Sequence, residues 1–109
     1  MGAMELISMI GNGRQECQSF TLAAGSSVTC RFSSSGSDTA TDKYFDLKDS
    51  ALRVAIYGTA DSELTHINGH ELKSPLPLGD NWNFWKIGIR WNKVTVRATV
   101  ATTFVVYAY

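Results

Sequence analysis

The amino-acid sequence predicts an all-β fold: an antiparallel β-sandwich or jelly roll of about seven to nine short strands. Apolar residues recur at every second position in several runs, which is the period of a strand with one buried face. Gly, Ser, Asn and Pro residues separate these runs and are typical of turns. No segment shows the spacing of an amphipathic helix.

The first two runs predict a hairpin. Phe20 and Leu22 share one face of the first run, and Val28 and Cys30 share one face of the second. A turn over residues 23–27 would place Leu22 opposite Val28 and Phe20 opposite Cys30. All four side chains would then lie on the same side of the pair, as a half-buried sheet requires.

The same register separates the two cysteines. Cys17 would lie three residues beyond the partner of Cys30 and on the other face, about 10 Å away along the strand. This distance is beyond the reach of a disulfide. We therefore expect reduced thiols, with Cys30 as a small core residue.

Asn68-Gly69 predicts a second hairpin, because both residues tolerate the positive φ angles of a tight turn. The turn would set three pairs of residues opposite one another: Ile67 and His70, His66 and Glu71, and Thr65 and Leu72. Residues 74–81 are expected to form a loop, since Pro75 and Pro77 cannot donate hydrogen bonds in a central strand.

The third predicted hairpin has the most regular alternation. Across a turn at Asn92-Lys93, four apolar pairs would face one another: Trp85 and Val100, Ile87 and Ala98, Ile89 and Val96, and Trp91 and Val94. The outward face of this hairpin would carry a row of basic and hydroxyl side chains: Lys86, Arg90, Thr95, Arg97 and Thr99. Such a row is either a solvated sheet face or a contact for an acidic partner.

The C-terminal run, residues 104–109, is apolar on both faces. A strand of this kind either lies in the middle of a packed sheet or is completed by another chain. Both alternatives are open. The second predicts a homo-oligomer interface made of four residues: Phe104, Val105, Tyr107 and Tyr109.

The composition indicates one neutral domain. Ten Lys and Arg residues balance ten Asp and Glu residues, which argues against a nucleic-acid partner. No apolar run approaches the ~20 residues of a membrane span.

We expect residues 1–4 to be a cloning remnant and residues 5–109 to form a single β-sandwich domain. We expect no signal peptide. The charge is polarised, because residues 1–80 carry 6 − 10 = −4 and residues 81–109 carry +4, and this favours contacts between sheets or between copies.

The sequence carries no recognisable motif for catalysis or metal binding. It has no Gly-x-Ser-x-Gly elbow and no phosphate-binding glycine loop, so we expect no enzyme activity. His66 and His70 would project from opposite faces of their hairpin, which disfavours a zinc site. One loop-like stretch carries four acidic residues that could supply oxygen ligands to calcium, but their spacing matches no EF-hand, and solvated acidic loops are commoner: Asp38, Asp42, Asp46 and Asp49. We therefore expect neither a cofactor nor a metal.

The best candidate binding surface in the sequence is the aromatic and amide segment of residues 80–84. A sugar presents a C–H face that packs on an aromatic ring, and vicinal hydroxyl groups that bond to planar amides or carboxylates. We expect this segment at a loop-to-strand junction, where binding residues are common. The predicted ligand-binding residues are His66, Asp80, Asn81, Trp82 and Asn83. In the alternative interpretation, Trp82 only caps the core.

Three segments of the chain resemble lectin-like sandwich modules: SVTCRFSSSGSD, ALRVAIYGTADSELTHI and NFWKIGIRWNKVTV. Their order is similar to that in farnesoic acid O-methyltransferase-like, laminin-G-like and galectin-like domains, in which a Trp-led strand precedes a Val-rich one. The resemblance implies a carbohydrate-binding β-sandwich. It implies no sugar ligand set, because the galectin-type His-Asn-Arg set and Trp-Gly-x-Glu segment are missing. TLAAGSSVTC and the C-terminal strand also resemble small β-rich virion proteins, such as phage decoration proteins and fibre tips.

Two functions are therefore expected. The first is a non-enzymatic, lectin-like module that binds a glycan through the loop around Trp82. The alternative is a small structural or assembly protein, for example of a virion, that self-associates through its C-terminal strand.

Overall fold

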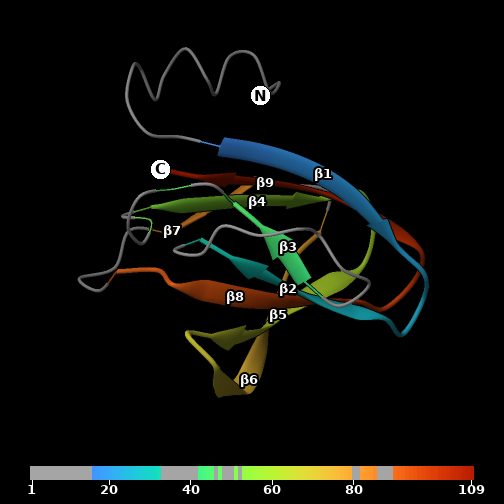
Figure 1. The fold of residues 1–109 in the computed structure, drawn as a ribbon. Coiled ribbons are helices and arrows are strands. Elements are labelled where there is room, and N and C mark those ends of the chain that lie inside the picture. The colour runs from blue at the N-terminus through green and yellow to red at the C-terminus, as the bar shows by residue number, and fades with distance from the viewer. Residues whose placement is uncertain are drawn as a thin grey trace.

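The computed structural model describes residues 16–32, 42–45, 47, 51, 53–79, 82–85 and 90–109. These residues form nine strands in two sheets that pack face to face (Figure 1), so the predicted all-β sandwich is confirmed. The strands are β1 (Glu16–Leu22), β2 (Ser27–Arg31), β3 (Asp42–Tyr44), β4 (Val54–Gly58), β5 (Ser62–Ile67), β6 (His70–Pro77), β7 (Trp82–Trp85), β8 (Lys93–Ala98) and β9 (Thr102–Ala108). No helix in the described ranges is long and apolar enough to cross a membrane.

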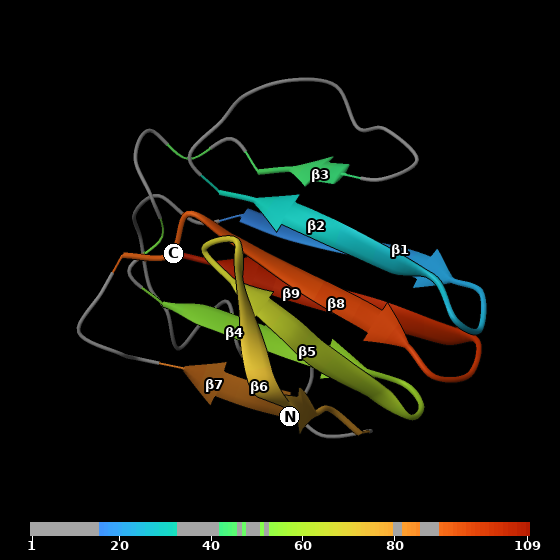
Figure 2. The same ribbon diagram turned by 90° about the horizontal axis from the view of Figure 1, so that it is seen from below.

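One sheet has four strands in the order β1-β9-β4-β7, and the other has five in the order β3-β2-β8-β5-β6. All neighbouring strands are antiparallel except β2 and β3, which run parallel. Figure 2, which looks onto the five-stranded sheet, shows β8 in the middle of this layer with β9 behind it. Most connections between consecutive strands therefore cross from one sheet to the other.

The predicted hairpin between the first two runs is wrong, because β1 and β2 belong to different sheets. Phe20 lies opposite Phe104 of β9, and Cys30 lies opposite Val94 of β8. Phe20 and Cys30 still point into the same core. The physical reason is that a shared apolar face is buried equally well by side-by-side pairing and by packing across the sandwich. Cys30 is buried, as expected, but the hairpin argument that separated it from the exposed Cys17 does not hold.

The predicted hairpin around Asn92-Lys93 is also wrong. Trp85 pairs with Val54 in the four-stranded sheet, whereas Val94 lies in the five-stranded sheet. Trp91 forms an isolated bridge with Ala51 instead of pairing with a residue of β8. The predicted partners Ile87 and Ile89 lie outside the described residues.

The hairpin at Asn68-Gly69 is confirmed. The φ angles of these residues are 52° and 82°, and the turn pairs Ile67 with His70 and His66 with Glu71. The predicted pair of Thr65 and Leu72 is wrong, because the register shifts between Leu64 and His66.

The predicted loop over residues 74–81 is wrong over its first half, because β6 continues to Pro77. Among the described strands β6 is an edge strand that pairs with β5 alone. An edge strand tolerates Pro75 and Pro77, because one of its sides needs no ladder hydrogen bonds.

The C-terminal strand lies inside its sheet. β9 pairs with β1 along one edge and with β4 along the other. Of the two alternatives for this strand, the structure therefore shows the first, a strand in the middle of a packed sheet. Phe104, Val106 and Ala108 point into the sandwich core, and Val105 and Tyr107 lie on the other face. The strand begins two residues earlier than the sequence suggested, at Thr102.

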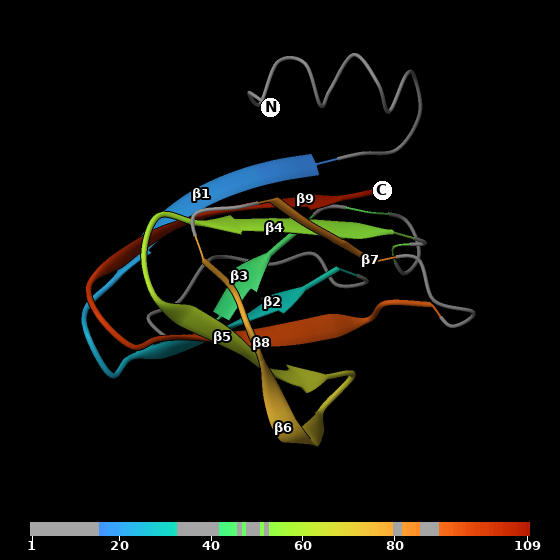
Figure 3. The ribbon, with the colours of Figure 1, turned by 180° about the vertical axis from the view of Figure 1, so that it is seen from behind.

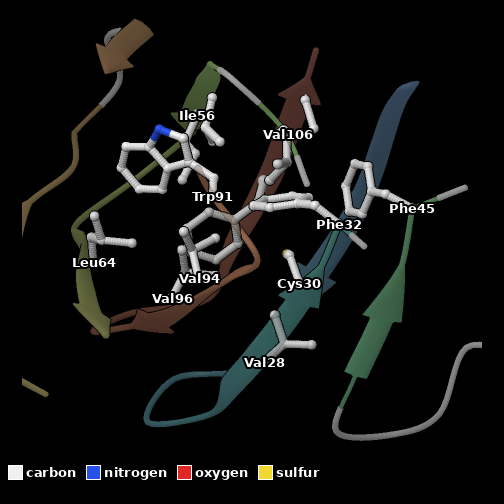
Figure 4. Close-up of a cluster of buried hydrophobic side chains, with 14 of the residues drawn as sticks. Val28, Cys30, Phe32, Phe45, Ile56, Leu64, Trp91, Val94, Val96 and Val106 are labelled. Atoms are coloured by element: carbon white, nitrogen blue, oxygen red, sulfur yellow. The ribbon is translucent and has the colours of Figure 1, made fainter. Parts of the chain in front are cut away.

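The main core fills the space between the two sheets. Figure 4 shows Trp91 and Phe32 surrounded by aliphatic side chains from both layers. Trp91 is fully buried and is the largest of these side chains. The alternation read from the sequence therefore identified the buried faces of β2 and β8 correctly, although the strand partners differ.

Candidate functional site

Three aromatic rings meet on the side of the four-stranded sheet that faces away from the core. Trp82 of β7 lies opposite Tyr57 of β4, with ring centroids 5.3 Å apart and planes inclined by 38°. The ring centroid of Tyr107, on β9, lies 5.7 Å from that of Trp82, and the planes are inclined by 49°. We call Tyr57, Trp82 and Tyr107 the aromatic face.

The aromatic face belongs to a small apolar cluster that is separate from the main core. Ala55 and Tyr107 are buried there, and Trp82 and Val105 pack against them while remaining partly exposed. Tyr57 is also partly exposed. Trp82 therefore does not cap the core between the sheets, and part of its surface reaches solvent.

Tyr107 adds a polar group to the aromatic face. Burial, followed by a hydrogen bond with the Cys17 thiol, raises the pKa of Tyr107 to about 12. Burial also raises the pKa of Cys17, which lies opposite Tyr107 in the β1–β9 register. Both groups therefore keep their protons at neutral pH.

The structure separates the residues that the sequence grouped into one site. Asp80 and Asn81 lie outside the described residues. Trp82 lies on the aromatic face, but its neighbour Asn83 lies opposite Ile56, which points into the core. The Nδ2 atom of Asn83 donates to the carbonyl oxygen of Ile56 at 3.4 Å. Since consecutive strand residues point to opposite faces, Trp82 and Asn83 do not present one joint surface.

His66 lies on the other sheet. Figure 3 shows β7, which carries Trp82, in the upper layer, and the hairpin of β5 and β6 in the lower layer. His66 and Trp82 therefore belong to opposite sides of the sandwich and cannot bind the same small ligand.

His66 instead lines a groove of about 370 Å³ on the outer side of the five-stranded sheet. The groove lies where β6 stands out from the sheet (Figures 1 and 2). Its lining combines hydroxyl, charged and aliphatic side chains: Ser27, Glu63, Thr65, His66, Glu71, Leu72, Lys73, Pro75, Thr95 and Arg97. We call this feature the groove.

A β-bulge shapes the floor of the groove. Leu64 is buried in the core and Ile67 packs against it, so both point inward. Thr65 and His66 lie between them, and both line the groove, although neighbours in a regular strand point to opposite faces. The register shift at this point in both β5 ladders accounts for this, because a bulge inserts a residue and re-aims side chains.

One ion pair and one close approach of an imidazole to a carboxylate lie in the groove. Arg97 Nη1 is 3.3 Å from Glu63 Oε1, and His66 Nε2 is 3.7 Å from Glu71 Oε2. The Thr65 hydroxyl lies 2.8 Å from His66 Nδ1 and 3.3 Å from the carbonyl oxygen of Thr95. Charged, hydroxyl and imidazole groups thus lie along one concave surface.

Sequence reasoning identified part of these two surfaces. The turn at Asn68-Gly69 predicted that His66 lies opposite Glu71. Thr95 and Arg97 belonged to the predicted row of basic and hydroxyl side chains. It missed Thr65, because a bulge has no sequence signature of its own. It also missed Tyr57, although the strict alternation after Ile56 places it on the outward face.

No three His, Cys, Asp or Glu side chains gather as a metal site in the part of the chain that the structure describes. No protein-family model, curated protein or solved structure matches the chain. The resemblance to lectin-like modules therefore stays a prediction.

Proposed function

We propose that the protein is a non-enzymatic, lectin-like carbohydrate-binding module, and that the aromatic face contacts the sugar. The observation that carries this proposal is the position of Trp82. It is partly exposed, packs against Tyr57, and lies outside the core that the two sheets enclose.

The chemistry of the aromatic face suits a sugar. The C–H side of a pyranose packs on the face of an indole or phenol ring, while its hydroxyl groups need donors and acceptors at the edge. Tyr57, which is partly exposed, carries a hydroxyl group beside the Trp82 ring, whereas Tyr107 is buried and its hydroxyl bonds to Cys17. The site thus offers an apolar surface with the Tyr57 hydroxyl at its margin.

The contrast with Trp91 supports a binding role for Trp82. Trp91 is fully buried between the sheets and contributes to the main core. Trp82 lies on the edge strand β7, where its removal leaves the main core intact.

The proposal is tested by a glycan array followed by isothermal titration of the best glycan. We expect binding by the wild-type protein and a loss of at least about tenfold in affinity for Trp82→Ala, with a smaller loss for Trp82→Phe. Val100→Ala is the matched control, because Val100 is 44% exposed and lies in the loop between β8 and β9. The proposal fails if no glycan binds, or if Trp82→Ala binds as tightly as wild type.

The alternative function, a structural or assembly protein, is supported by a different observation. Val105 and Tyr107 of the C-terminal strand lie in the cluster on the outer side of the four-stranded sheet. Because both edges of β9 are already paired, copies would associate face to face through this cluster, and Phe104 in the core would not take part. Light scattering at high protein concentration separates the two functions, since a strictly monomeric chain would contradict assembly.

A further inference from the structure

We propose that the groove is a second saccharide-binding site, on the opposite side of the sandwich from the aromatic face. One chain would then bind two sugar units at once. This inference rests on the proposed function for the class of ligand, but it uses none of the same side chains.

The groove exists because β6 arches away from β5. Glu71 lies opposite His66, and the next registered pair is Leu76 with Leu64. The four residues 72–75 therefore span a stretch in which Thr65 is the single residue of β5. This excess length lifts the arch outward, so that Leu72, Lys73 and Pro75 form a wall above the sheet.

The hydrogen-bonding groups of the groove match a neutral, hydroxyl-rich ligand. Two acidic side chains, Glu63 and Glu71, are balanced by two basic ones, Lys73 and Arg97. A ligand of one charge would be repelled by half of this set, whereas a polyol finds both donors and acceptors. Carboxylate and guanidinium groups are planar and bidentate, which suits the vicinal hydroxyl groups of a pyranose.

The charged groups lie at two levels of the sheet. Arg97 is opposite both Glu63 of β5 and Ser27 of β2, and Thr95 is opposite His66. Positions two residues apart on a strand are separated by about 7 Å. This spacing is comparable to the distance across a pyranose ring with its hydroxyl groups, so one sugar unit reaches both levels.

Hydrogen bonds around Thr65 hold the imidazole ring of His66. The Thr65 hydroxyl lies 3.3 Å from the carbonyl oxygen of Thr95, which accepts, and 2.8 Å from Nδ1 of His66, where either atom can be the donor. Nε2 of His66 faces the Glu71 carboxylate at 3.7 Å. Thr65 is therefore a positioning residue, and Nε2 and the Glu71 carboxylate are the groups that would bond to a hydroxyl group of the ligand.

The wall of the arch supplies the apolar contact. Leu72 packs against the core, and Pro75 is exposed on the edge strand. These aliphatic groups give a smaller stacking surface than an aromatic ring. Affinity at the groove should therefore depend mainly on hydrogen bonds, unlike affinity at the aromatic face.

The test is an NMR titration of the full chain, labelled with ¹⁵N, against four methyl glycosides: those of glucose, galactose, mannose and N-acetylglucosamine. We expect at least one glycoside to shift the backbone amides of Thr65, His66 and Thr95 in a saturable manner. Thr65→Val should weaken this binding about tenfold, because it keeps the shape but releases the His66 ring. Thr65→Ser, which restores the hydroxyl group, should recover most of the affinity.

Thr21→Val is the matched control, because Thr21 is an exposed threonine whose hydroxyl also pairs across the ladder, with Thr103 at 3.0 Å. It should leave groove binding unchanged. If Thr65→Val unfolds, Glu71→Ala replaces it, since the Glu71 side chain is 80% exposed and its loss should leave the fold intact. Equal binding by Thr65→Val, Thr65→Ser and wild type would overturn the assigned role of Thr65.

The two sites are distinguished by Trp82→Ala. If this variant still shows the groove shifts, the second site stands whether or not the aromatic face binds. If shifts occur only around Trp82 and Tyr57, the groove proposal fails and the proposed function survives. If no glycoside shifts either region, both proposals fail, and shifts produced only by inorganic phosphate would contradict the ligand class.

Discussion

The Oδ1 atom of Asn68 accepts a hydrogen bond from the backbone N–H of Asn92 at 2.7 Å. The Nδ2 atom of Asn68 also donates to the carbonyl oxygen of Arg90 at 3.0 Å. The backbone N–H of Asn68 donates to the carbonyl oxygen of Lys93 at 2.8 Å. One residue thus forms the turn between β5 and β6 and fastens it to the segment that enters β8. Because β5 carries the bulge of the groove, this contact also fixes the position of the groove.

Asn68 should therefore matter for stability in two separable ways. Asn68→Ala should lower the free energy of unfolding by about 2–3 kcal/mol, since it loses the side-chain hydrogen bonds and makes the φ angle of 52° unfavourable. Asn68→Gly should lower it by about 1–2 kcal/mol, because glycine tolerates this φ angle. Urea denaturation measures both values. Equal losses in the two variants would show that the backbone conformation contributes nothing.

Gly58 is required by a close approach at the end of β4. A Cβ atom at this position would lie 2.8 Å from the side-chain oxygen Oγ of Ser62, which is closer than a carbon and an oxygen atom can pack. Gly58→Ala should lower the free energy of unfolding by about 1–3 kcal/mol. In the double variant with Ser62→Ala the clash disappears, so the combined loss should be smaller than the sum of the single losses. Additive losses in thermal denaturation would argue against this crowding.

The two cysteines should react at very different rates. Cys17 is exposed and Cys30 is fully buried in the core, so a thiol reagent should label one group in the native protein and the second only on unfolding. Because the pKa of Cys17 is raised, its labelling rate should keep rising to a higher pH than that of a free thiol. Tyr107→Phe should raise this pH further, since the hydrogen bond with Tyr107 opposes the shift. Two equally fast thiols in the native state would contradict the burial of Cys30.

Tyr107 should make stability fall at alkaline pH. Its pKa is raised from 10.0 to about 12, so folding favours the neutral phenol. This contribution is complete below about pH 10 and is lost as the pH rises towards 12. The difference in stability between wild type and Tyr107→Phe should shrink over this window, as measured by urea denaturation at each pH. A difference that stays constant would show that Tyr107 titrates near its ordinary value.

The sequence predicted which face of a strand is buried, but it did not predict which strands pair with one another. The alternation in Val94, Val96 and Ala98 predicted which side chains of β8 are buried, because burial depends on the period of the strand. The same alternation does not say which strand lies alongside. Trp85 pairs with Val54 and not with Val100, because the chain crosses from one sheet to the other between β7 and β8. A hairpin would have kept both strands in one sheet.

The one confirmed hairpin shows what made prediction possible there. Asn68-Gly69 fixes two positive φ angles, and this conformation leads the chain back beside itself. The short loops after β4 and β8, which the structure describes in full, contain no residue with a positive φ angle, and the loop after β1 contains one, Gly25. Each of these loops leads to the other sheet. Local chemistry therefore determined one turn, while packing of the two layers determined the rest.

The candidate surfaces were predictable to a smaller extent. Trp82 and His66 were identified from their chemistry, but their separation onto opposite sides of the sandwich depends on the sheet assignment of β5 and β7. The groove depends on a difference in length between two paired strands: β6 has four residues, 72–75, where β5 has only Thr65. This difference can be recognised only when the pairing of β5 with β6 is known.

The most direct test of the carbohydrate-binding account is saturation-transfer difference NMR with the best-binding methyl glycoside and selective irradiation of aromatic protein protons. Stacking on Trp82 and Tyr57 predicts strong transfer to the C–H protons on one face of the sugar ring, and loss of most of this transfer in Trp82→Ala. Absence of transfer from the aromatic protons, or equal transfer in wild type and Trp82→Ala, would contradict the account.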